Sequence, residues 1–248
     1  MTVTGNLVVV VGGYGLGIID VSTPSSPAQV GVVYCGDARG VVVVGNLAYV
    51  AANFDGLRII DISTPATPIE IGFIDTPGTA TGVAVMGSHA YVADGASGLR
   101  IIDVTVPTAP VEVGSFNTAG TASAVAVSGA YAYVADGLVG GLRIMDISTP
   151  SSPTEVGSYS CYALDVVVTG TIVYIANDLN SGVVVDAAMS ANPKAIGWFG
   201  SGGIGRGVAV SGDLVFRAAD YAGMDISNSR SCDPHASVPV ISTNNSAA

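Results

Sequence analysis

The chain has 248 residues, of which 49% are hydrophobic, 11% are charged and 33 are glycine. This composition excludes a solvated disordered chain, and the length suffices for a single large β-domain. The formal net charge of −11 leaves no basic stripe for a phosphate backbone, so we expect no nucleic-acid partner.

A repeat of about forty residues runs through the chain. Aspartates that follow an apolar run recur at intervals of 39 to 43 residues, at Asp20, Asp61, Asp103, Asp146, Asp186 and Asp225. Each unit combines a Val-Ala-Val-like run, a Tyr-Val-Ala-like run, an apolar run that ends in the aspartate, and a Val-Gly run. β-branched segments separated by Gly, Asp, Ser and Pro turns predict four antiparallel strands per unit and no helix.

The first unit begins directly at a strand, residues 2–5, and the third shows four strands at 82–85, 89–94, 99–103 and 111–114. The fifth unit lacks the Ser-Thr-Pro turn, and the sixth ends without a Val-Gly run. A period near forty with four strands per unit is typical of propellers. The sequence therefore predicts an all-β fold, a six-bladed β-propeller of four-stranded antiparallel blades over residues 1–230, with five or seven blades as alternatives.

Residues 231–248 form a C-terminal tail that contains a β-prone segment at 237–242. An unpaired strand edge invites association, so we expect this segment to cover the edge of the sixth blade. It either closes its own blade or is donated to a neighbouring molecule as an assembly strand through Val238, Val240 and Ile241.

Charged residues recur in phase with the repeat. Arg58, Arg100 and Arg143 each precede a glutamate by twelve residues, Glu70, Glu112 and Glu155. We expect these pairs to be directly opposed across a hairpin as cross-strand ion pairs rather than ligand groups. The repeated aspartates are expected to accept N–H groups of the following turn rather than to bind calcium.

Loops between the second and third strands are predicted to share one face with the links between blades. The candidate ligand-binding residues on this face are Asp37, Arg39, Asp55, Asp94, Asp136, Asp178, Arg206 and Asp220. Arg39 and Arg206 stand near the expected axis, where other repeats have Thr81, Ser123 and Leu164. The two arginines either hold an anion or a sugar carboxylate, or are neutralised by Asp37 and Asp220.

Several functional classes lack the residues they need. His89 and His235 are the only histidines, too few for a typical metal-histidine site and poorly suited to a Ser/His/Asp site. We therefore expect no catalytic residue, metal or cofactor. Cys35, Cys161 and Cys232 have no disulfide-framework spacing, and the odd count leaves at least one free or paired between chains. We expect Cys35 and Cys161 to be buried thiols. The longest apolar runs fall far below the roughly 20 residues of a membrane-spanning helix. We expect no membrane span, and residues 1–4 do not begin an export signal.

The segment Leu-Arg-Ile-Ile-Asp-Ile-Ser-Thr-Pro at 57–65, with copies at 99–107 and 142–150, resembles the LVIVD-repeat β-propeller family over residues 3–228. The resemblance implies a propeller found largely in exported or surface-attached microbial proteins, with no catalytic motif to carry over.

We therefore expect a non-enzymatic extracellular or cell-surface propeller that serves as an interaction, structural or self-assembly module, with a protein or a second copy as partner. A propeller that binds a glycan or a small anion is the first alternative. A carboxylate-based hydrolase or lyase is the second, and it would require a buried carboxylate with a raised pKa in the central funnel.

Overall fold

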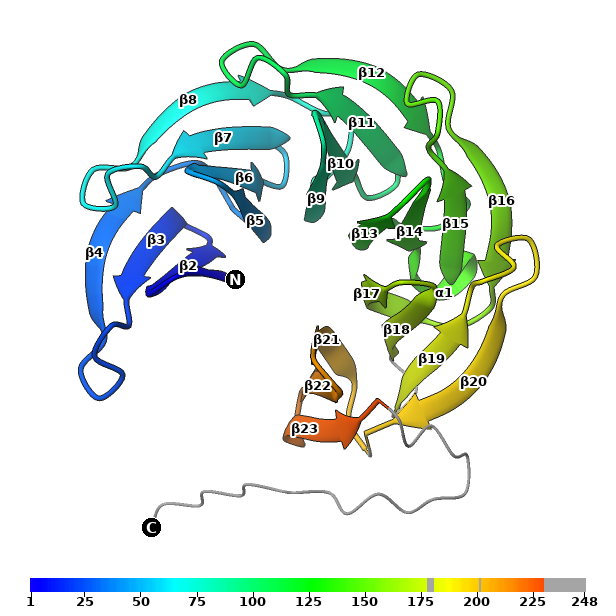
Figure 1. The fold of residues 1–248 in the computed structure, drawn as a ribbon. Coiled ribbons are helices and arrows are strands. Elements are labelled where there is room, and N and C mark those ends of the chain that lie inside the picture. The colour runs from blue at the N-terminus through cyan, green and yellow to red at the C-terminus, as the bar shows by residue number, and fades with distance from the viewer. Residues whose placement is uncertain (178–180, 201, 230–248) are drawn as a thin grey trace.

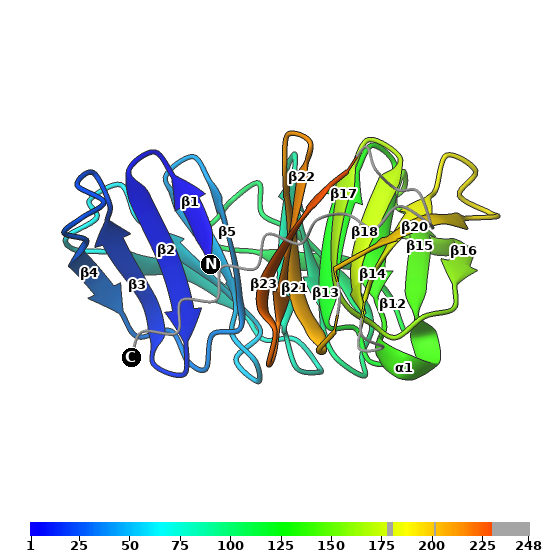
Figure 2. The ribbon, with the colours of Figure 1, turned by 90° about the horizontal axis from the view of Figure 1, so that it is seen from below.

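The computed structural model describes residues 1–177, 181–200 and 202–229. Its strands form six antiparallel sheets arranged as blades around an axis (Figure 1), which confirms the all-β six-bladed propeller. In the described part of the chain the only helix is α1 (Gly137–Gly140), a single turn that the strand pattern did not predict. It lies at the lower face of the disc in Figure 2, in the loop between the second and third strands of blade 4.

Five blades have four strands, and among the described residues the sixth has three. Blades 1 to 3 contain β1 (Thr2–Thr4), β2 (Leu7–Gly12), β3 (Gly15–Asp20), β4 (Ala28–Val33); β5 (Gly40–Val44), β6 (Leu47–Ala51), β7 (Leu57–Asp61), β8 (Ile69–Ile74); β9 (Gly82–Met86), β10 (His89–Ala93), β11 (Leu99–Asp103), β12 (Val111–Phe116). Blades 4 to 6 contain β13 (Ala124–Ser128), β14 (Tyr131–Ala135), β15 (Leu142–Asp146), β16 (Thr154–Tyr159); β17 (Ala163–Thr169), β18 (Ile172–Asn177), β19 (Gly182–Asp186), β20 (Lys194–Phe199); β21 (Gly205–Ser211), β22 (Leu214–Ala219), β23 (Gly223–Asn228). The predicted assembly strand with Val238, Val240 and Ile241 lies outside the described residues.

The hydrophobic core lies between neighbouring blades. Blade 3 illustrates the rule, because successive side chains of a strand point to opposite faces of the sheet. Its rear face packs on blade 2 and consists of Ala90, Val92, Ile102 and Val104. Its forward face packs on blade 4 and consists of Tyr91, Ala93, Leu99 and Ile101. Since both faces are covered, the second strand is apolar at every position after His89.

The repeated aspartates close the turn after the third strand, as predicted. The Ser63 N–H donates to Asp61 over 2.8 Å and lowers the pKa of that carboxyl. The prediction was wrong for Asp225, because blade 6 pairs Leu214 with Asn228 where blade 3 pairs His89 with Asp103. Asn228 therefore holds the aspartate position, and Asp225 falls three residues earlier in the repeat.

The three predicted Arg–Glu ion pairs are present, with N–O distances of 3.7, 3.4 and 3.0 Å in blades 2, 3 and 4. They are not directly opposed, however. In blade 3, Arg100 lies opposite Ser115, and Glu112 lies opposite Ile102. The turn is centred one residue later than expected, which shifts the register by two residues, and a β-bulge adds a third residue on the outer strand, so the pair is diagonal.

The backbone of the following blade lies directly against the glycine of the Val-Gly run. A Cβ atom on Gly72 would lie 2.0 Å from the carbonyl oxygen of Pro107 in blade 3, and one on Gly114 would lie equally close to that of Pro150 in blade 4. Only a residue without a side chain permits this approach. The Val-Gly and Ser-Thr-Pro segments are thus two halves of one contact between blades.

We expect Gly72→Ala to destabilise the propeller, because the new methyl group must displace the backbone of blade 3. Overpacking of this kind costs roughly 1–3 kcal/mol, which lowers the Tm by several degrees in a chain of this length. The matched control is Gly17→Ala, also within a strand, where the added Cβ meets Val10 Cγ2 at an ordinary 3.4 Å. Equal melting temperatures for the two variants, measured by calorimetry, would contradict the close contact.

Candidate functional site

A cavity of about 320 Å³ opens at the centre of the propeller, where the inner strands of blades 2 to 6 converge. Five residues at one position of successive repeats line it: Arg39, Thr81, Ser123, Leu164 and Arg206. Two of them join neighbouring blades, since the Thr81 hydroxyl donates to Ala122 O and the Ser123 hydroxyl donates to Leu164 O. The expected place of the two arginines near the axis is confirmed.

Both arginines lie against carboxylates. Arg39 Nη2 is 2.5 Å from Asp37 Oδ2, and Arg206 donates through Nε and Nη2 to the two oxygens of Asp220 over 2.8 and 2.9 Å. These pairs correspond to the second interpretation of the sequence, in which the positive charges are neutralised. The arginine side chains are still 55% and 58% exposed, so an anion has access but competes with Asp37 and Asp220.

Asp94 and Asp136 are fully buried. Asp94 accepts hydrogen bonds from the Thr76 hydroxyl and the Gly78 N–H, both in the link from blade 2 to blade 3. Burial raises the pKa of Asp94, and these hydrogen bonds oppose that rise. Asp136 makes the same two contacts with the next link. Both carboxylates hold a link to a loop, and neither lines the cavity.

The two remaining candidate ligand-binding residues, Asp55 and Asp178, are not placed at the cavity. Asp55 lies 3.6 Å from Arg58, away from the residues that line the cavity, and Asp178 lies outside the described residues. Over the described ranges, no group of three or more His, Cys, Asp or Glu side chains is placed to hold a metal ion. None of the helical structure described there is long and apolar enough to cross a membrane.

Asp165 is a cavity residue that the sequence analysis missed. It is the only carboxylate among the described residues that line the cavity, and burial raises its pKa. Its two oxygens accept the N–H groups of Val166 and, in blade 6, Val208, each over 2.9 Å. The sequence signal that could have identified Asp165 was an acidic residue inside the apolar run of β17. In the structure, a bulge between Ala163 and Asp165 interrupts the strand register there. Asp165 thus joins blade 5 to blade 6.

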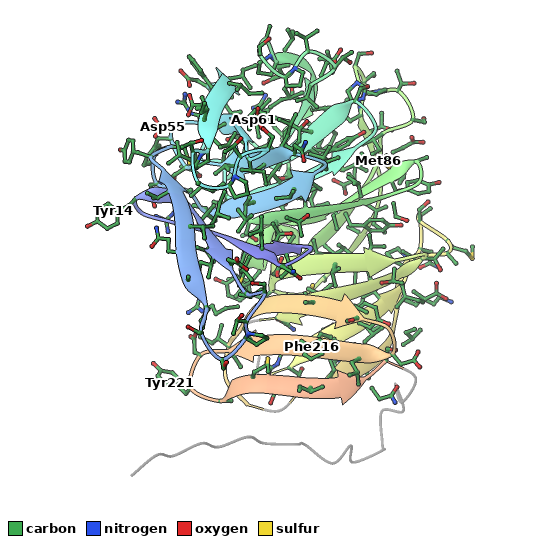
Figure 3. The ribbon with its side chains drawn as sticks, turned by 60° about the vertical axis from the view of Figure 1, so that its left-hand side comes forward. Tyr14, Asp55, Asp61, Met86, Phe216 and Tyr221 are labelled. Carbon is green, nitrogen blue, oxygen red and sulfur yellow. The ribbon has the colours of Figure 1, made fainter. Side chains whose placement is uncertain are left out.

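Large apolar side chains are exposed on the face that carries the loops between second and third strands, here termed the loop face. They are 67–97% exposed and comprise Tyr14, Tyr34, Phe54, Leu138, Val139 and Tyr221. Figure 3 shows Tyr14, Asp55 and Tyr221 along this side of the disc, with Met86 on the opposite side. Isolated exposed apolar residues are ordinary, whereas a contiguous apolar patch is typical of an interaction surface.

Blade 6 contains a buried ion pair that has no counterpart in its neighbour. Arg217 is fully buried and contacts Asp225 Oδ2 at 2.6 Å, and it donates to the carbonyl oxygens of Gly202 and Gly203. Blade 5 has Ile175 and Val183 at the two corresponding positions. The sequence analysis missed this pair because it placed Asp225 in the wrong phase of the repeat.

We expect Asp225→Asn to cost about 3–5 kcal/mol, because it leaves the Arg217 charge buried without its counter-ion. The double variant Arg217→Ile/Asp225→Val, which copies blade 5, should recover most of that loss, since well-packed apolar groups often replace a buried ion pair at little cost. Chemical denaturation measures both. A double variant no more stable than Asp225→Asn would show that the pair itself is strongly stabilising.

Comparison with known proteins agrees with this repeat architecture. The LVIVD repeat matches four consecutive segments, residues 1–34, 35–76, 77–118 and 119–161. No curated protein matches the chain. A functionally unknown protein from Desulfotomaculum acetoxidans DSM 771 superimposes with a TM-score of 0.76 at 14% identity, over 90% of this chain and 75% of that one. The computationally designed Ika8 protein superimposes with a TM-score of 0.70 at 11% identity, over 94% and 71%. At such low identity these likenesses show the fold alone, whereas the four repeats show that the chain belongs to the LVIVD-repeat family.

Proposed function

We propose that the protein is a non-enzymatic interaction module whose binding surface for other proteins is the loop face. The observation that carries this proposal is the group of six large apolar side chains exposed there. Aromatic residues are enriched at the centres of protein interfaces, and Tyr14, Tyr34, Phe54 and Tyr221 supply four. Loops on a rigid repeated scaffold are the usual carriers of such specificity.

The roles of the buried carboxylates support binding over catalysis. Glycoside hydrolysis by carboxylates generally requires two of them flanking the scissile bond. Asp165 has the raised pKa expected of a catalytic acid, but it is the only carboxylate on the described cavity lining, and both of its oxygens accept backbone N–H groups. Asp94 and Asp136 are equally engaged in holding links.

The proposal includes an extracellular or cell-surface location. Its support is compositional: Lys194 is the only lysine, and 11% of the residues are charged. The resemblance to largely exported or surface-attached propellers points the same way.

We expect the triple variant Tyr14→Ser/Phe54→Ser/Tyr221→Ser to lose its partner, because it removes the exposed rings without touching the core. The test is affinity capture from the surface and secreted fraction of the source organism, quantified by mass spectrometry. Recovery of at least one protein should fall tenfold or more. The control is Val106→Ser/Met189→Ser, which changes exposed residues in turns on the opposite face. The proposal would be contradicted if every captured protein were recovered equally well with the wild type, the triple variant and the control variant.

A glycan or small-anion site in the central cavity is the second candidate, supported by the two partly exposed arginines there. Calorimetric titration with uronic-acid oligosaccharides and with sulfate tests it. Binding by the wild type, abolished in Arg39→Ala/Arg206→Ala at unchanged Tm, is the expected result for this candidate. Absence of binding, or a loss that merely follows unfolding, would reject it.

A further inference from the structure

The link from blade 4 to blade 5 is shorter than the link before it. Both links end at an isolated β-bridge, made by Ala122 in the first case and by Ala163 in the second. Ala122 follows Phe116, the last residue of β12, by six residues. Ala163 follows Tyr159, the last residue of β16, by only four residues. The link into blade 5 is therefore two residues shorter than the link into blade 4.

The loop that faces this short link is longer than its counterpart in blade 3. It contains six residues, 136–141, between β14 and β15, whereas the loop between β10 and β11 contains five, 94–98. The longer loop forms α1, which exposes Leu138 and Val139 to 67% and 76%. A pocket of about 360 Å³, here termed the side pocket, lies at the long loop and the short link. The side chains that shape it are those of Thr121, Ser123, Leu138, Val139, Tyr162 and Leu164.

The side pocket offers an apolar, uncharged environment. Among the described residues that line it there is no charged side chain, and Leu138, Val139, Tyr162 and Leu164 supply four large apolar or aromatic ones. An apolar cavity of about 150 Å³ already holds a benzene ring. Small-ligand sites are typically pockets of roughly 300–1,000 Å³ with mainly apolar walls and few polar groups. The side pocket thus suits an aromatic or branched aliphatic group.

The side pocket adjoins the central cavity that holds the two arginines. Ser123 and Leu164 line both spaces. Leu164 and Arg206 occupy the same position in consecutive repeats, and their strands, β17 and β21, pack against each other beside the axis (Figure 1). The Arg206 side chain is 58% exposed in the central cavity. An apolar group in the side pocket is therefore separated from a guanidinium by the width of one blade junction.

We propose that the side pocket and Arg206 together bind a carboxylate that carries an apolar group, either the C-terminal residue of a peptide or a free aryl acid. A guanidinium matches the geometry of a carboxylate and binds it through charge-assisted hydrogen bonds. The ligand competes with Asp220, which accepts from Arg206 over 2.8 and 2.9 Å. Burial of the apolar group supplies the affinity that a simple anion lacks in this competition. The inference rests on the anion site proposed for the central cavity and adds its apolar half.

Calorimetric titration of the full chain tests the proposal with two probes, 4-phenylbutyrate and the peptide acetyl-Ala-Ala-Phe, each as the acid and as its primary amide. At least one acid should bind, and its amide should bind at least tenfold more weakly because it cannot form the charge-assisted pair. The probe that binds more tightly identifies the source of the carboxylate, a small acid or a chain terminus.

Three variants separate the two halves of the site. Arg206→Gln should weaken binding of the acid at least tenfold, because it removes the positive charge. Asp220→Asn should strengthen binding several-fold, because it removes the competing carboxylate, and a merely structural role of this residue predicts no such gain. Leu138→Ser/Val139→Ser should weaken binding of the acid at least tenfold and leave binding of sulfate unchanged.

Val106→Ser/Met189→Ser is the matched control for the apolar half, since it also replaces two exposed apolar side chains, on the opposite face. It should bind the acid as the wild type does. The proposal would be overturned if neither acid bound at up to about 10 mM, if acid and amide bound equally, or if Asp220→Asn weakened binding at an unchanged Tm.

Sulfate distinguishes this inference from the anion site on which it rests. Sulfate binding that depends on Arg206, together with acids that bind no more tightly than acetate, would reject the apolar half and leave the anion site intact. No binding of sulfate, uronic-acid oligosaccharides or either acid would reject both. The loop-face proposal fails separately, because Tyr14, Phe54 and Tyr221 do not line the side pocket and their replacement leaves these titrations unchanged.

Discussion

The propeller depends on the apolar contact between the forward face of one blade and the rear face of the next. A single four-stranded sheet of this chain exposes two apolar faces, and burial of such surface contributes roughly 25 cal/mol per Å². Tyr91 and Val92 adjoin in sequence yet are buried against different blades, so neither face of blade 3 is covered by its own residues. Stability in such repeats comes from nearest neighbours, and the contacts at each end of the array are therefore decisive.

Polar groups in the same contacts keep the blades in register. Thr81, Ser123 and Asp165 each bond to the next blade beside the cavity, while Asp94 and Asp136 bind the links at the loop face. Buried polar groups must be satisfied, so each of these bonds specifies one relative placement of two blades. The acidic residues of the central region are thereby occupied by the fold, which supports the proposal that the exposed apolar side chains of the loop face carry recognition.

The family relation is strongest where this contact pattern is most regular. The repeats matched at residues 1–161 are the first four blades, whereas the link from blade 5 to blade 6 uses Asp165, and the Arg217–Asp225 pair fills a site that is apolar in blade 5. Replacing both partners of a buried ion pair by apolar groups often costs little stability, and in some proteins such pairs instead specify structure. Here the pair gives the last blade an interior distinct from that of blade 5.

The sequence by itself determined the period, the strand order, the turn caps such as Asp61, and the arginines beside the axis, because each follows from local chemistry repeated in phase. Tertiary structure alone decided the diagonal offset of Arg100 and Glu112, since neither the centre of the turn nor a bulge can be read from a count of residues. It also decided that Asn228 rather than Asp225 ends the third strand of blade 6, and that Asp165 reaches the next blade. Whether an apolar face is covered depends on which sheets lie side by side, and only the three-dimensional arrangement shows that Tyr91 and Val92 are buried against different blades.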